Sequence, residues 1–379
     1  MKPWPTVRLG EVLRHRKEFI TIDDVTNYKR PRVQLHVQGI VLRDEVPGAL
    51  IKTKTQQVCR AGEFLVAEID AKVGGFGIVP QSLAGSIVSS HYFLFVIDKL
   101  KLDRRFLDFF ICTPTFREQV AAQGTTNYAA IRPAHVLGYE IPLPPLAEQR
   151  RVVARIEALA AQIHEARTLR HQAAEEAEIL LRSILTHDEQ AKPTPMRELV
   201  KLRPPDVTVR ADETYQFAGV YCFGRGVFKS VRKSGMDFGY PRLTRLRAGE
   251  FVYPKLMAWE GALGVVPPDC EGCVVSTEFP VFEVNQKRVL PEVLDTYFRT
   301  PSVWPEIAGE STGTNIRRRR LNPQDFLDYE MPLPSMETQV TLRKVRAEVD
   351  ALKRLQAATA AELDALLPAI FDRAFKGEL

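Results

Sequence analysis

The sequence lacks the features that mark several common classes of protein. No apolar run reaches about 18 residues, the length that suggests a membrane helix, and the Met-Lys-Pro-Trp start has no apolar signal-peptide core. Only five of the 379 residues are cysteine, an odd number that suits a reducing compartment better than a disulfide framework. We therefore expect a cytoplasmic protein with no membrane contact.

Motifs for catalysis and for cofactor binding are also missing. The segment Gly224–Ser230 lacks the spacing of a P-loop, and Cys270-x-x-Cys273 has no second Cys or His pair at zinc spacing. Glu68-x-Asp70-x-Lys72 resembles nuclease carboxylates with a lysine, but such short patterns are common. Asn322–Asp325 is not the Asn-Pro-Pro-aromatic pattern of adenine methyltransferases. We expect no catalytic residue, no metal site and no cofactor in this chain.

The composition is that of an ordinary globular protein. Hydrophobic residues make up 45% and charged residues 26% of a chain long enough for two medium domains. The formal net charge of +5 permits a polyanionic partner without requiring one.

The most informative stretch is Tyr139–Leu185. Its prolines predict an extended segment and then a first helical turn, where a missing N–H is tolerated. Apolar residues then recur in steps of four and three, the period of a coiled-coil seam, with one charged interruption. The expected seam positions are Val152, Ile156, Leu159, Ile163, Ala166, Arg170, Ala173, Ala177, Leu180 and Ile184.

The same pattern occurs twice. Ala61–Phe64 recurs as Ala248–Phe251 and Gly77–Pro80 as Gly264–Pro267, with the same offset in both matches, and the proline signature returns at Tyr329. A second helix with the four-three period follows, from Val345 to Ile370. An ordered set of matches indicates an internal repeat.

The repeat predicts an α+β architecture with two α/β domains. We expect domains at 1–144 and 188–334, a first spacer helix at 145–187, and a second spacer helix with the C-terminal tail at 335–379. In the first domain, short apolar runs predict strands at Val33–Val41 and Phe64–Ile69, and helical spacing predicts one helix over Leu102–Val120. The simplest way to bury both helical seams is an antiparallel coiled coil.

These residues resemble one family closely, the DNA-specificity subunits of type I restriction-modification systems. The resemblance covers essentially the whole chain and rests on Trp4–Val12, Ile141–Gln149, Met331–Pro334 and the Ala374–Leu379 ending. In the second signature, Ser335, Met336 and Thr338 stand where the first has Pro145, Leu146 and Glu148, which weakens that match locally.

The resemblance implies a non-catalytic subunit in which each domain reads half of an asymmetric bipartite DNA target. The implied partners are double-stranded DNA, two adenine-N6 methyltransferase subunits and, through them, restriction or translocase subunits; S-adenosylmethionine would be bound by the methyltransferase. Two alternatives stay open. The chain could serve a methylation-only system, or it could be a protein scaffold whose end domains no longer bind DNA.

Basic residues interleaved with aromatic ones are the candidate DNA contacts, because arginine suits guanine or phosphate and amides suit adenine. An ordinary solvated surface, salt bridges to a partner subunit, or a plain polar hairpin would show the same pattern. The candidates in the first domain are Arg30, Arg32, Lys52, Lys54, Gln56, Gln57, Asn127, Tyr128 and Arg132. Those in the second domain are Arg225, Lys229, Arg232, Lys233, Tyr240, Arg242, Arg245, Asn315, Arg317, Arg318 and Arg319.

Overall fold

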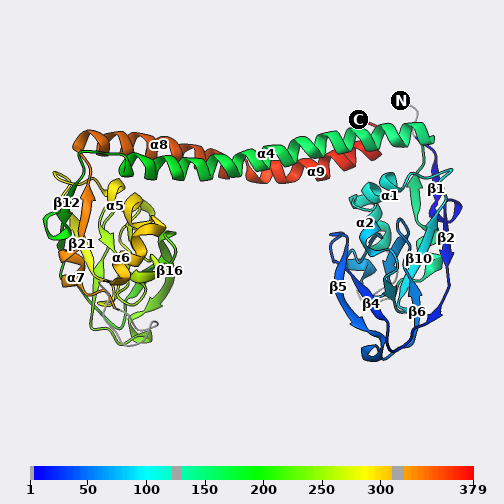
Figure 1. Cartoon of the computed structure of the whole chain (residues 1–379), viewed down its shortest axis with the longest axis horizontal. Coiled ribbons are helices and arrows are strands. Elements are labelled where there is room, and N and C mark those ends of the chain that lie inside the picture. Colours follow the sequence, from blue (N-terminus) through cyan, green and yellow to red (C-terminus); the bar gives the residue numbers. More distant parts are fainter. Residues whose placement is uncertain (1–3, 122–129, 310–319) are drawn as a thin grey trace. The chain divides into compact units, whose positions relative to one another are not determined.

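A computed structural model describes residues 4–121, 130–309 and 320–379. The chain divides into two compact units (Figure 1). Unit 1 comprises Met1–Thr168 and Thr359–Leu379, and unit 2 comprises Leu169–Ala358. The long helix α4 (Leu146–Thr186) contributes its first part to unit 1 and its last part to unit 2.

Unit 1 is built around a four-stranded antiparallel sheet. Its strand order is β2 (Leu13–Arg16), β10 (Tyr92–Ile97), β7 (Phe64–Ala67) and β8 (Phe76–Ile78). The helices α1 (Arg104–Phe110) and α2 (Pro114–Ala121) lie between these strands and α9 (Ala360–Phe375) (Figure 1). Asp103 begins α1 by accepting hydrogen bonds from the backbone of Arg105 and Phe106.

The remaining elements of unit 1 are short. A two-stranded ladder joins β1 (Thr6–Arg8) to β11 (Glu140–Pro142), with α3 (Pro133–Gly138) just before it. A three-stranded sheet holds β3 (Ile20–Thr21), β6 (Thr55–Val58) and β9 (Ile87–Val88). The hairpin of β4 (Asn27–Val33) and β5 (Ile40–Pro47) completes the unit.

Unit 2 repeats the central sheet with β13 (Val200–Leu202), β21 (Val281–Val284), β18 (Phe251–Val252) and β19 (Gly264–Val265). The ladder of β12 (Lys192–Pro195) and β22 (Glu330–Leu333) repeats the one in unit 1. A five-stranded sheet orders β14 (Val207–Thr208), β17 (Arg242–Arg245), β20 (Val274–Val275), β15 (Thr214–Tyr221) and β16 (Gly226–Ser234). The helices are α5 (Pro291–Phe298), α6 (Trp304–Gly309), α7 (Pro323–Asp328) and α8 (Met336–Ala358).

The strand registers of the two central sheets match residue by residue. Phe64 pairs with Ile78 in unit 1, and Phe251 pairs with Val265 in unit 2, so both partners are displaced by the offset of the sequence repeat. The same displacement relates the pairing of Leu13 with Ile97 to that of Val200 with Val284. The offset seen in the sequence is therefore an offset between equivalent strands.

Within each unit, α4 runs antiparallel to a helix from the end of the chain. In unit 1, Arg167 of α4 pairs with Asp364 of α9 at 2.8 Å, and Arg151 donates to the Leu379 carbonyl. In unit 2, Lys353 of α8 pairs with Glu178 of α4 at 2.5 Å. These contacts agree with the predicted antiparallel direction, and the coiled coil itself stays a prediction.

The structure confirms the mixed helix and sheet architecture and corrects several local predictions. Val33–Val41 covers the end of β4, the hairpin turn and the start of β5 rather than one strand. The helix expected over Leu102–Val120 is divided, because Pro114 begins a new helix. The second long helix is interrupted at Thr359, between α8 and α9.

One predicted seam residue is also corrected. Leu181 is fully buried in the core of unit 2, whereas Leu180 is half exposed. Ala177 and Ile184 do pack against that core. A straight helix of 3.6 residues per turn drifts from a strict four-three repeat, so the buried position moves by one.

Candidate nucleic-acid interface

The β15–β16 hairpin carries a basic surface in unit 2. Arg225, Lys229, Arg232 and Lys233 are all exposed, and no acidic residue occurs between Thr214 and Lys233. A surface of this kind attracts a polyanion because no neighbouring carboxylate on the hairpin neutralises its charge.

Aromatic rings support this basic strand. Tyr221 stacks on Phe228 with ring centroids 3.7 Å apart and an angle of 15° between the planes. The Arg225 guanidinium lies 4.8 Å from the centroid of the Tyr221 ring. The rings and the cation therefore form a layered stack that restricts the Arg225 side chain.

The other predicted contacts in this part of unit 2 lie on or near β17. Arg242 donates to the Pro205 carbonyl at 2.5 Å, and Arg245 donates to the Gly272 carbonyl at 3.3 Å. Arg245 and Arg232 line a polar recess of about 280 Å³ together with Thr214 and Gln216. Tyr240 is exposed beside Phe238, at a centroid distance of 6.2 Å.

The predicted contacts of unit 1 divide into paired and exposed residues. Arg30 forms two hydrogen bonds of 2.7 Å to Asp44, and this interaction raises the pKa of Arg30 and lowers that of Asp44. Lys54 contacts Asp24 at 2.5 Å and the Gly48 carbonyl at 2.6 Å. Arg32 and Lys52 are exposed.

Gln56 and Gln57 do not present their amides to a ligand. Both side chains are buried, at 5% and 2% exposure. Gln56 donates to the Thr53 carbonyl, and Gln57 donates to the carbonyls of Ser89 and Tyr92. The predicted role of these two amides in reading bases is therefore replaced by a structural role within unit 1.

Arg132 belongs to a small charged cluster at the start of α3. Its guanidinium pairs with one oxygen of the buried Glu68 carboxylate, and the His91 Nδ1 lies 2.6 Å from the other. Arg132 itself is largely exposed, so it remains accessible to an anion. Glu68, which the sequence showed in a nuclease-like pattern, is an ion-pair partner here.

The remaining predicted contacts lie outside the described residues. They are Asn127 and Tyr128 of the first domain and Asn315, Arg317, Arg318 and Arg319 of the second. Arg320, the last of that arginine run, is described and pairs with Glu278 at 2.5 Å.

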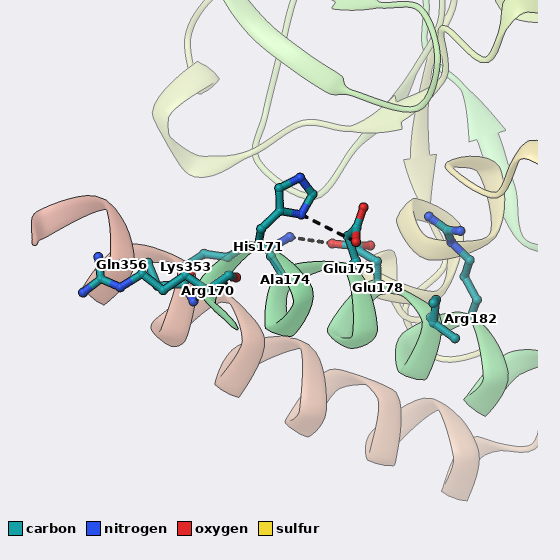
Figure 2. Close-up of a pocket in the computed structure, with 9 residues that line it drawn as sticks. Arg170, His171, Ala174, Glu175, Glu178, Arg182, Lys353 and Gln356 are labelled. Atoms are coloured by element: carbon teal, nitrogen blue, oxygen red, sulfur yellow. Dashed lines mark hydrogen bonds and ion pairs between the residues drawn. The ribbon is translucent and has the colours of Figure 1, made fainter. Parts of the chain in front are cut away.

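The sequence did not reveal a groove in unit 2 between α4 and α8 (Figure 2). This recess of about 820 Å³ is lined by Arg170, His171, Ala174, Glu175, Glu178, Ile179, Arg182, Lys353 and Gln356. Burial raises the pKa of Glu178. The hydrogen bond and the positive charge of Lys353 outweigh this effect of burial, so the pKa of Glu178 is lowered overall. Arg170, Ala174 and Glu178 are four positions apart, which places them on one face of the helix. This spacing is the feature of the sequence that could have indicated the groove.

The described residues contain no cluster of His, Cys, Asp or Glu that could hold a metal ion. Within the same ranges, no helix is long and apolar enough to cross a membrane.

Solved structures resemble this chain along its whole length. Comparison with protein-family models and with curated proteins gives no match. The HsdS subunit from Thermoanaerobacter tengcongensis is 24% identical with a TM-score of 0.62, and the match covers 100% of this chain and 98% of that one. A chain from a study of complex assembly and conformational transition in the type I R-M system is 24% identical with a TM-score of 0.65, covering 100% and 99%. The resemblance found in the sequence is thus confirmed in three dimensions: the chain has the fold of the HsdS specificity subunits of type I restriction-modification systems.

Proposed function

We propose that this chain is a sequence-specific DNA-binding subunit that recognises an asymmetric bipartite target. The observation that carries the proposal is the repeat itself. The central sheets of the two units share their registers, yet the exposed hairpins carry different side chains at equivalent positions: Lys229 and Arg232 of unit 2 stand where unit 1 has Leu42 and Glu45. Two similar scaffolds with different surfaces suit two different half-sites.

The paired helices are the proposed docking surface for methyltransferase subunits. One of the similar structures comes from a study of complex assembly in the type I R-M system, which supports such a partner. The groove between α4 and α8 offers both signs of charge and the exposed Ile179. A mixed surface of this kind suits a protein better than a nucleic acid, whose charge has one sign.

The chemistry would belong to the partner. In this proposal the methyltransferase binds S-adenosylmethionine and methylates adenine N6, and this chain contributes recognition only. A restriction or translocase subunit would join through the methyltransferase. Methyl transfer by the isolated chain should be undetectable.

A random DNA library tests the proposal directly. The purified chain with its methyltransferase partner should enrich a motif of two unlike half-sites separated by a gap, with binding that weakens steeply as salt rises. A scaffold without DNA recognition would enrich no motif and show little salt dependence. Mapping methyladenine in the source genome would identify the methylated motif. The presence or absence of a nuclease gene beside the gene for this chain then distinguishes a restriction system from a methylation-only system.

A further inference from the structure

The tips of two hairpins share an unusual backbone conformation. Among the described residues other than glycine, His36, Val37 and Phe223 alone have positive φ, at 58°, 59° and 62°. Gly224, the residue after Phe223, has a φ of 66°. His36 and Phe223 are related by the same sequence offset as the strands of the central sheets, so the left-handed pair occurs at the same place in each unit. Residues with side chains adopt this conformation at a free-energy cost.

Equivalent hydrogen bonds hold both tips. In unit 1, the backbone N–H of His36 donates to Val73 and that of Val37 donates to Gly74, at 2.7 and 3.1 Å. In unit 2, the N–H of Phe223 donates to Glu260 and that of Gly224 donates to Gly261, at 2.8 and 3.0 Å. The backbone of the tip is thus fixed in both units, while its side chains are free to differ.

In unit 2 the fixed tip positions the Arg225 guanidinium. Its Nε donates to the Cys222 carbonyl at 3.3 Å, and its Cζ lies 4.8 Å from the centroid of the Tyr221 ring that stacks on Phe228. Within the described ranges, its Nη atoms have no hydrogen-bond or ion-pair partner. Burial and the nearby Glu260 carboxylate raise the pKa of the Cys222 thiol. Arg225 therefore presents an exposed guanidinium of fixed orientation, whose N–H groups can donate hydrogen bonds, at the end of a basic hairpin.

We propose that Arg225 is a specificity-determining residue that reads the major-groove edge of a guanine in the half-site bound by unit 2. The inference rests on the proposed DNA-binding function. A two-stranded β-ribbon fits the major groove, and a guanidinium fork bonds guanine O6 and N7 together. Orienting the fork before binding reduces the side-chain entropy lost on contact. The lysines and Arg232 farther along β16 would contact phosphates.

The matched position in unit 1 is Gln38, which is exposed beyond the equivalent turn. An amide bonds adenine N6 and N7 in the same bidentate manner. The same scaffold would thus read guanine in one half-site and adenine in the other.

Selection from a random DNA library by the complex with the methyltransferase tests the assignment. We expect Arg225→Gln to replace or relax the preference at one base pair of one half-site, lowering affinity for the original target by about 10- to 100-fold. Arg225→Lys should relax the same base pair while leaving the salt dependence unchanged. Gln38→Arg should alter one base pair of the other half-site only.

The matched control is Lys287→Gln, which removes one exposed charge from unit 2 outside the hairpin and should leave the motif intact. If Arg225→Gln keeps the motif and weakens all sequences equally with a shallower salt slope, Arg225 contacts phosphate and the base assignment is wrong. An unchanged motif with unchanged affinity would also overturn it, while the proposed function stands. If the wild-type complex enriches no motif, both proposals fail together.

Discussion

Gln149 and Gln339 make the same three hydrogen bonds in the two units. The Gln149 amide accepts from the Asp103 N–H and donates to the carbonyls of Lys101 and Pro144, each at 2.8 Å. Gln339 accepts from Leu290 and donates to Arg288 and Pro334 at 2.9 to 3.1 Å. Both side chains are buried, so each amide joins its proline signature to the start of α1 or α5.

Removing either amide should destabilise its own unit. Gln149→Ala or Gln339→Ala leaves buried backbone groups without partners, and we expect a loss of about 3 kcal/mol in the free energy of unfolding. Hydrogen exchange should show faster exchange near Asp103 in the first variant and near Leu290 in the second. Gln162→Ala, on the exposed face of α4, is the control and should change little. Equal effects on both units from one substitution would contradict independent roles.

The ion pair between Glu178 and Lys353 should make stability depend on pH. The pKa of Glu178 is held below its ordinary value of 4.5, so the pair stabilises the fold above that pH and this stability is lost as pH falls through the lower folded pKa. Lys353→Met should therefore cost about 1 kcal/mol near pH 7 and much less at an acid pH below the folded pKa of Glu178. Urea unfolding at both values measures the difference.

The control for that experiment is Lys344→Met, an exposed lysine of the same helix. Arg346 and Arg299 also lower the pKa of Glu178 and remain in the variant, which limits the size of the effect. A loss of stability that is the same at both pH values would show that Lys353 acts by packing alone.

The basic strand β16 should account for part of the salt dependence of DNA binding. Replacing Lys229, Arg232 and Lys233 by glutamine should lower the slope of log affinity against log salt by roughly one for each phosphate interaction removed, without changing the recognised sequence. Binding titrations at several salt concentrations give the slope. A changed motif would mean that at least one of the three reads a base.

Each unit should recognise one DNA half-site independently of the other unit. Replacing residues 196–328 with the equivalent segment of an HsdS subunit of the same fold should change one half-site and leave the other intact. Library selection reads out both halves at once. A change in both would count against separate readers.

The cysteines should be structural. Burial raises the pKa of Cys270 to about 11 and that of Cys112 to about 12, so these thiols should react slowly with a thiol reagent at pH 8 until the protein unfolds. A chelator should leave the unfolding temperature unchanged. A lower unfolding temperature with chelator would indicate that Cys270 and Cys273 hold a metal.

The sequence by itself determined the repeat, the mixed architecture and the long helices, because these depend on periodic patterns that local geometry imposes. The offset that relates Phe64 to Phe251 in the sequence became a match of strand registers. The proline signatures at Ile141 and Met331 became the ladder strands β11 and β22.

Only the tertiary structure decided which polar side chains face outward. Gln56 and Gln57 are consecutive strand residues, so alternation would expose one of them, yet protein covers both. Arg30 is engaged by Asp44, 14 positions away, and Arg225 is oriented by rings across the hairpin. The left-handed turn at His36 is fixed by the distant carbonyl of Val73. Such contacts join residues whose proximity depends on the folded chain, so no local pattern encodes them.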